Sequence, residues 1–220
     1  LGGVSHAVSS HARCPVMIAK HPLHDEPHEI SPRMTRLLVP CDGSHSSIAA
    51  LKWIANLHWH EETEVSLLAV IDAVKNKYEK ESDPQKATDI MFQWQERRTH
   101  LQKSLTELAE YLEKISELKH IHVKIINGDP REAIVQYANE WKADLIVIGS
   151  HGHTRLAMLL LGSVAQAVLT HAHCAVELIK TCEENELEEA QDDSGPEDVR
   201  EDLNDVRPMD NLHIPPTGMM

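Results

Sequence analysis

Three glycines and a serine in the second half of the chain have the types and spacing of a phosphate-binding turn. Gly149, Gly152 and Gly162 are followed by Ser163 in the pattern Gly-x2-Gly-x9-Gly-Ser. Glycine has no Cβ, so backbone N–H groups can approach an anion closely. A helix is expected to begin at Ser163, and the unpaired N–H groups of a helix start attract phosphate oxygens. The pattern indicates an anion-binding turn, although a tight turn without a ligand would use the same residues.

A carboxylate adds a second kind of chemistry earlier in the chain. Asp42 stands in the segment Pro40-Cys-Asp-Gly-Ser44, directly after an apolar run. Its carboxylate could accept hydrogen bonds from two ribose hydroxyls, or it could cap the helix that follows, for which Ser44 and Ser46 are also candidates. If Asp42 and the glycines lie at neighbouring strand ends, one site holds a carboxylate and a phosphate cradle.

Strands and helices that alternate along the chain are needed to position these residues. We expect strands at residues 34–40, 64–72, 121–126, 145–148 and 175–179, and helices at 48–57, 84–118, 130–141 and 163–171. The strand centres are almost entirely apolar, which is typical of parallel strands covered on both faces. The sequence therefore predicts a doubly wound, Rossmann-like α/β domain, with its ligand at the carboxyl ends of the strands.

The predicted helix at 84–118 carries an apolar stripe at spacings of three, four and seven. Its members are Ile90, Trp94, Leu101, Leu105, Leu108, Leu112 and Ile115. Such a stripe favours packing against the core of the domain over binding of a partner.

A repeat defines the domain organisation. Residues 1–20 and 161–180 align without gaps and are identical at ten of twenty positions, including Lys20 and Lys180. The offset of one domain length predicts that residues 1–20 are the last helix and strand of a preceding module. The expected divisions are then this remnant (1–20), a linker (21–32), one complete domain (33–180) and an acidic, disordered tail (181–220).

Charge and composition narrow the function classes. The net charge is −14, but residues 181–220 hold thirteen acidic residues and two arginines, so the rest of the chain carries only −3. A basic surface for nucleic acid is missing from the sequence, and the apolar run near residues 156–169 is too short to span a bilayer. The four cysteines do not suggest a disulfide framework, so a reducing cytoplasm is the expected location. We expect neither nucleic acid nor membrane as a partner.

The motifs together resemble those of the universal stress protein family, in its ATP-binding form. Gly149, Gly152, Gly162 and Ser163 fill every position of that family's glycine motif, and residues 39–44 match its first strand ending. The resemblance covers residues 33–180 and implies a five-stranded parallel sheet of order 3-2-1-4-5. It also implies self-association through the fifth strand, so residues 15–20 should lie beside residues 175–180, within the chain or from another copy.

The resemblance assigns binding roles position by position. Asp42 would bind ribose; Pro40, Val70 and Ile148 would surround adenine; Ser44 belongs to the matched first-strand motif. The residues expected to meet ribose and phosphates are Gly149, Gly152, His153, Gly162, Ser163 and Val164. The implied ligand is ATP, with ADP or AMP as alternatives, and Mg or Mn would be held through the phosphates.

Two functions remain open at this stage. The first is an ATP-binding module for nucleotide sensing or signalling in a stress response. The alternative is a nucleotide-free dimerisation or scaffold module of the same fold. Whether the chain is an enzyme stays open: the sequence contains no Walker-type motif and no evident base to activate water, so at most slow ATP hydrolysis is expected.

Overall fold

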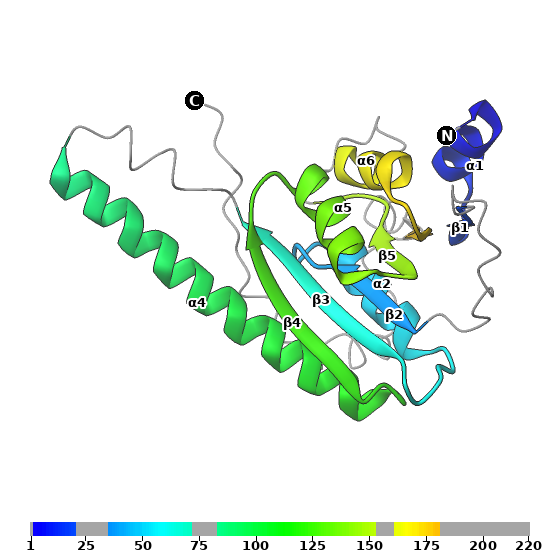
Figure 1. Cartoon of the computed structure of the whole chain (residues 1–220), viewed down its shortest axis with the longest axis horizontal. Helices are drawn as coiled ribbons and strands as arrows, with labels where there is room; N and C mark the ends of the chain where they lie inside the picture. Colours follow the sequence, from blue (N-terminus) through cyan, green and yellow to red (C-terminus); the bar gives the residue numbers. More distant parts are fainter. Residues whose placement is uncertain (1, 21–34, 72–82, 153–160, 181–220) are drawn as a thin grey trace, which may run out of the picture.

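The computed structural model describes residues 2–20, 35–71, 83–152 and 161–180. Their elements run in the order α1 (Gly3–His11), β1 (Val16–Ile18), β2 (Arg36–Pro40), α2 (His45–Ala55), β3 (Glu64–Ile71), α4 (Pro84–Ile115), β4 (His120–Asn127), α5 (Pro130–Trp141), β5 (Leu145–Gly149), α6 (Ser163–His171) and β6 (Ala175–Ile179). Figure 1 shows a central twisted sheet with helices on both faces.

The sheet confirms the predicted topology and adds one strand to it. Its order is β1-β6-β5-β2-β3-β4, and the five strands from β2 to β6 are parallel. Numbered within the domain, these five strands have the predicted order 3-2-1-4-5. The sixth strand is β1, which pairs antiparallel with β6. This edge strand is the expected neighbour of residues 175–180, and it is supplied within the same chain, so that the sheet has six strands.

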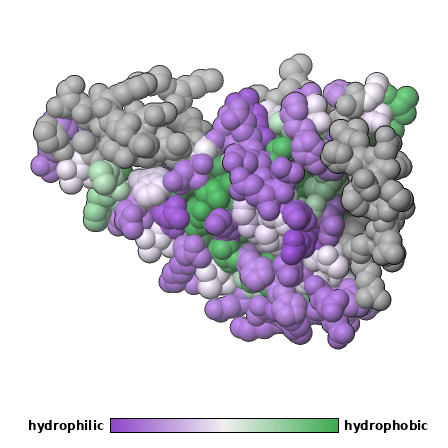
Figure 2. All heavy atoms as spheres, in the orientation of Figure 1, coloured by the Kyte–Doolittle hydropathy of each residue, from purple (hydrophilic) through white to green (hydrophobic). Residues whose placement is uncertain are grey.

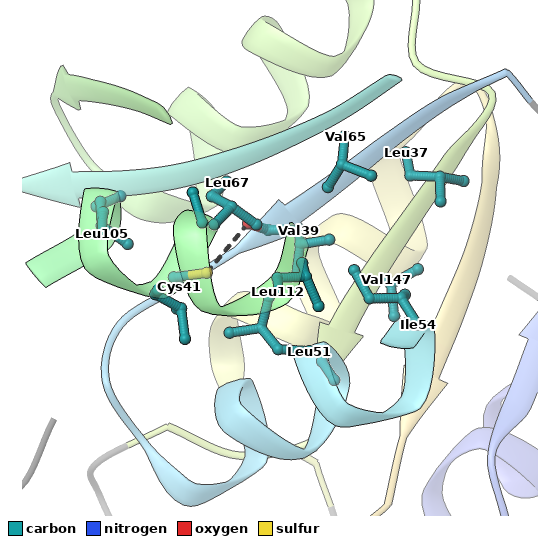
Figure 3. Packing of buried hydrophobic residues seen from close by; sticks show 14 of the residues in the cluster. Leu37, Val39, Cys41, Leu51, Ile54, Val65, Leu67, Leu105, Leu112 and Val147 are labelled. Carbon is teal, nitrogen blue, oxygen red and sulfur yellow. Dashed lines mark hydrogen bonds between the residues drawn. The ribbon is translucent and has the colours of Figure 1, made fainter. Parts of the chain in front are cut away.

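Two apolar layers hold the helices against the sheet. One lies under α2 and α4 and is drawn in Figure 3, where Leu51 and Ile54 of α2 and Leu105 and Leu112 of α4 point toward the strands. The other lies under α5 and α6. The central strand β5 is buried along its whole length. Burial on both faces explains why the strands read as continuous apolar runs.

The apolar stripe of α4 packs as predicted over only part of the helix. Leu101, Leu105, Leu108 and Leu112 are buried, whereas Ile115 is 48% exposed, which corrects its assignment to the core. The N-terminal half of α4 projects beyond the sheet in Figure 1. Hydrophobic residues appear there and in a short central strip of the otherwise largely hydrophilic face in Figure 2.

The described helices include none with both the length and the apolar character needed to cross a membrane.

Three of the four cysteines, Cys14, Cys41 and Cys174, lie in the described ranges and are free thiols. Burial raises the pKa of the Cys174 thiol to about 11.

Candidate functional site

The candidate site lies where β2 and β5 end. These strands are parallel neighbours, with Leu37 beside Leu145 and Leu38 beside Ile146. Their carboxyl ends therefore lie at the same edge of the sheet. The turn after β2 contains Asp42, and the turn after β5 contains Gly152. Topology alone thus brings the acidic turn next to the glycine-rich turn.

The two turns touch each other. A Cβ built on Gly152 would lie 3.0 Å from Oδ2 of Asp42, so the carboxylate sits directly against the bare backbone of the glycine. The other carboxylate oxygen, Oδ1, accepts a hydrogen bond of 2.9 Å from the backbone N–H of Ser44. Asp42 is exposed at this edge. Its geometry allows one oxygen to order the turn while the second faces the glycine loop.

Ser44, and not Asp42, is the residue that caps α2. Its side chain accepts a hydrogen bond from the backbone N–H of Ser47, and the helix begins at His45, three residues before the predicted start. Gly43 between the two has φ of +83°, a left-handed conformation that favours glycine. The alternative role of Asp42 as a helix cap therefore belongs largely to Ser44.

Gly149 and Gly162 of the glycine pattern each have a structural reason. At Gly149 an added Cβ would lie 2.6 Å from the backbone carbon of Ser46, so this glycine lets α2 pack directly on the end of β5. The backbone N–H of Gly162 donates to the carbonyl of Ser150 at 2.8 Å, which returns the chain to the start of the loop. The glycines thus make close backbone approaches whether or not a ligand is present.

Helix α6 points its N-terminus at the same edge. Gly162 is the N-cap residue and provides no side-chain hydrogen bond. The first N–H groups of any α-helix lack intrahelical acceptors, so those at Ser163 and Val164 are available to an anion. Ser163 is exposed and Val164 is partly buried. Ser163 and Val164 are the residues predicted to meet phosphates.

The residues predicted to surround adenine lie at the same edge. Pro40 and Ile148 are buried at the ends of β2 and β5, and Val70 is partly buried near the end of β3. Of the three, Val70 has exposed apolar surface, whereas Pro40 and Ile148 are covered by protein. His153 lies outside the described residues, so its predicted contact has no structural counterpart here. All the other predicted site residues lie at this edge of the sheet.

Sequence reasoning missed two serines that hold the site together. Ser46 lies on α2 and its hydroxyl donates to the carbonyl of His151 in the glycine loop. Ser150 is 1% exposed, and its backbone N–H donates to the carbonyl of Ile179 on β6 at 2.9 Å. Ser46 had been considered only as a helix cap. For Ser46 the available signal was its place beside Ser47 after Ser44, because buried hydroxyls need partners. The contact of Ser150 is made by its backbone, for which the sequence holds no signal.

Metal ligands do not cluster in the described part of the chain. No group of three or more His, Cys, Asp or Glu side chains there could hold a metal ion. The described part of the site consists of one carboxylate, bare backbone, a helix N-terminus and apolar residues at the strand ends. These elements suit a ligand with hydroxyl, phosphate and flat apolar parts.

The fold and this edge define a doubly wound α/β domain with a glycine-rich turn against an acidic turn. The model of the universal stress protein family matches residues 34–180. The chain belongs to the universal stress protein family, as its motifs predicted.

Individual relatives agree with this placement. The universal stress protein MJ0531 of Methanocaldococcus jannaschii is 32% identical over 147 residues, which cover 66% of this chain and 81% of the relative. The solved structure of protein MJ0577 from the same organism matches with a TM-score of 0.56 at 27% identity, covering 67% of this chain and 96% of that one. A universal stress protein structure from Archaeoglobus fulgidus matches 82% of this chain and 54% of its own length, with a TM-score of 0.52. At 24% identity, that last match shows the fold alone.

Proposed function

We propose that this chain is an ATP-binding universal stress protein that acts as a nucleotide-sensing or signalling module. The observation that carries the proposal is the approach of Asp42 to Gly152, at 3.0 Å from the carboxylate to the position of an added Cβ. A ribose bound by Asp42 would place its phosphate chain over the glycine turn and toward the N-terminus of α6. ADP or AMP would use the same ribose contacts.

Among the residues that the structure describes, few side chains at this edge could support catalysis. Asp42 is the carboxylate beside the glycine turn, and it is used in the proposal for ribose. A divalent ion, Mg or Mn, would be held by the phosphates of the nucleotide. We therefore propose that the chain binds ATP for signalling and hydrolyses it at most slowly. We propose a cytoplasmic location as a separate point.

The same fold could instead serve as a nucleotide-free dimerisation or scaffold module. The observation in favour is the strand pair β1–β6, which joins two copies of the repeated segment. Under this proposal residues 1–20 are the end of a preceding domain, and self-association would place β1 of one copy on β6 of another.

Titration calorimetry with ATP would test the nucleotide proposal, with Asp129→Ala as the matched control for Asp42→Ala. Both carboxylates follow a strand and accept a backbone hydrogen bond of 2.9 Å from the residue two positions later. Only Asp42 lies against Gly152. We expect Asp42→Ala to weaken binding by roughly 1.5 to 3 kcal/mol, since charge-assisted bonds are lost, and equally for ATP and AMP. Asp129→Ala should bind as the unchanged chain does.

The outcomes separate the proposals. Equal affinities in the two variants would contradict the site at Asp42. Absence of ATP, ADP and AMP binding in the unchanged chain would favour the scaffold module. Mass spectrometry of nucleotide released from the denatured, purified protein would show which adenine nucleotide is carried.

A further inference from the structure

The strand pair β1–β6 has a local two-fold relationship. Its three facing pairs are Val16 with Leu178, Met17 with Glu177, and Ile18 with Val176. Adding the repeat offset of 160 to the β1 residues turns one outer pair into the other. The central pair maps onto itself, so the two-fold axis passes through it. The repeated segments therefore meet as two copies of one surface would meet in a symmetric dimer.

The contacts of Lys20 and Lys180 are related by the same two-fold symmetry. The ammonium group of Lys20 donates to the carbonyl of Leu169 at 2.6 Å, near the end of α6. The equivalent Lys180 donates to the carbonyl of Ser10 at 3.3 Å, near the end of α1. Each lysine thus places a positive charge at the C-terminus of the other repeat's helix, where the helix dipole favours a cation. Burial lowers the pKa of both lysines.

The helices themselves repeat the geometry. The N-cap residues Gly2 and Gly162 are both extended, and so are the C-cap residues Ala12 and Ala172. In each helix the C-cap N–H donates to the carbonyl four residues earlier at 2.9 Å. Because the two segments have the same backbone geometry, a second copy of α6–β6 could take the place of α1–β1.

The centre of the pair breaks the symmetry. Met17 is 46% exposed, whereas Glu177 opposite it is 4% exposed. Oε2 of Glu177 has no hydrogen-bond partner among the residues that the structure describes. Glu177 lies beside Val147 of β5, on the face of the sheet covered by α2.

No charge from the neighbouring elements compensates Glu177 in the described ranges. The titratable side chains of α2, His45 and Lys52, are exposed, as is Arg13 before β1. Lys20 of the β1 segment reaches α6 on the opposite face. Burial accordingly raises the pKa of Glu177.

We propose that Glu177 selects the partner strand of β6: it accepts a strand with an uncharged residue at the facing position, as Met17 in β1, and rejects a second copy of β6. In a β6–β6 pair the outer residues and Lys180 would find equivalent partners, but Glu177 would face itself. Side chains directly opposite in antiparallel strands have Cβ atoms about 4.5–5.5 Å apart. Two carboxylates held there, with little solvent, repel each other.

The full chain allows a direct test through Met17→Glu, with Met17→Gln as the uncharged control of similar length. At pH 8 we expect Met17→Glu to lower the amide hydrogen-exchange protection of residues 16–18 by roughly tenfold or more, because it creates the forbidden pair within the chain. The control should retain protection. The exchanged pair, Met17→Glu with Glu177→Met, should also retain it, since only one carboxylate remains.

Sedimentation velocity on the same variants tests the rejection of a second copy. With β1 released, Met17→Glu should stay monomeric at pH 8. As the pH is lowered, after correction for intrinsic exchange rates, it should recover protection, because one carboxyl takes a proton and burial raises the pKa of Glu177.

Several results would overturn the proposal. These are full protection in Met17→Glu at pH 8, equal loss in the control or in the exchanged pair, and a Met17→Glu dimer at pH 8. Lack of protection at residues 16–18 in the unchanged chain would also overturn it. None of these measurements involves nucleotide, so the proposed ATP site stands or falls separately.

Discussion

The first two glycines of the glycine pattern, Gly149 and Gly152, should respond differently to the same added methyl group. In Gly149→Ala the new Cβ would lie 2.6 Å from the backbone of Ser46, closer than real Cβ contacts, so α2 must move away from β5. Overpacking of this kind costs about 1–3 kcal/mol, and a backbone neighbour places it near 3. The loss of unfolded-state freedom offsets about 0.4–1 kcal/mol. A net destabilisation of roughly 2 kcal/mol follows, or about 4–8 °C in Tm for a domain of this size.

Gly152→Ala is the matched comparison, because its Cβ would meet only the end of the Asp42 side chain, at 3.0 Å. That carboxylate is exposed and can rotate, so stability should change by no more than about 0.5 kcal/mol. ATP affinity should fall, since the carboxylate is pushed from the position proposed for ribose. Urea denaturation followed by circular dichroism and calorimetry with ATP measure the two effects. A Gly149→Ala chain as stable as the unchanged one would refute the close packing of α2 on β5, and unchanged affinity in Gly152→Ala would refute the site.

Two further predictions concern the scaffold. Leu105→Ala should lower the free energy of unfolding, measured by urea denaturation, by about 2–5 kcal/mol, because Leu105 is fully buried. Phe92, on the projecting part of α4, is 66% exposed, so Phe92→Ala should change that free energy by no more than about 0.5 kcal/mol. Equal effects of the two substitutions would contradict the placement of α4. Hydrogen bonds from Arg131 lower the pKa of Asp129 to about 2. The stability that Asp129 contributes is therefore present above its unfolded pKa of about 3.9 and is lost as pH falls toward 2. The difference in unfolding free energy between the unchanged chain and Asp129→Asn should shrink between pH 5 and pH 2.5, and a difference that stays constant would contradict this origin.

The sequence predicted the sheet well because its strands are buried on both faces. The run ending at Ile148 is apolar throughout, and parallel strands that are buried on both faces are typically seen as such runs in a sequence. The start of α2 was less visible. His45, Ser46 and Ser47 carry no apolar periodicity, and the position of the helix start depends on the hydrogen bond from Ser47 to Ser44. The sequence predicts Ser44 and Ser46 as cap candidates, and the backbone shows that Ser44 is the cap.

The exposure of Ile115 has a related cause. An apolar pattern that repeats every seven residues drifts around a straight α-helix, by about 20° per heptad. Over the 32 residues of α4, the same stripe therefore cannot face one sheet from end to end. Leu101 to Leu112 face the core and Trp94 packs against it partly buried, whereas Ile115 at the end of the helix is exposed. Periodicity predicted the helix, while the length of the sheet decides which of its residues are buried.

The direction of β1 follows from symmetry, although the repeat alone predicted only its neighbour. Two equal edge strands related by a two-fold axis perpendicular to the sheet must run antiparallel, so a symmetric pairing of residues 15–20 with 175–180 permits no other direction. The observed register agrees with this, as the central pair Met17–Glu177 lies on the axis. The difference between these two residues is visible in the sequence, but its meaning is not, because only the structure shows that Glu177 is buried. A single mismatch in an otherwise repeated segment becomes informative once its position on the axis is known.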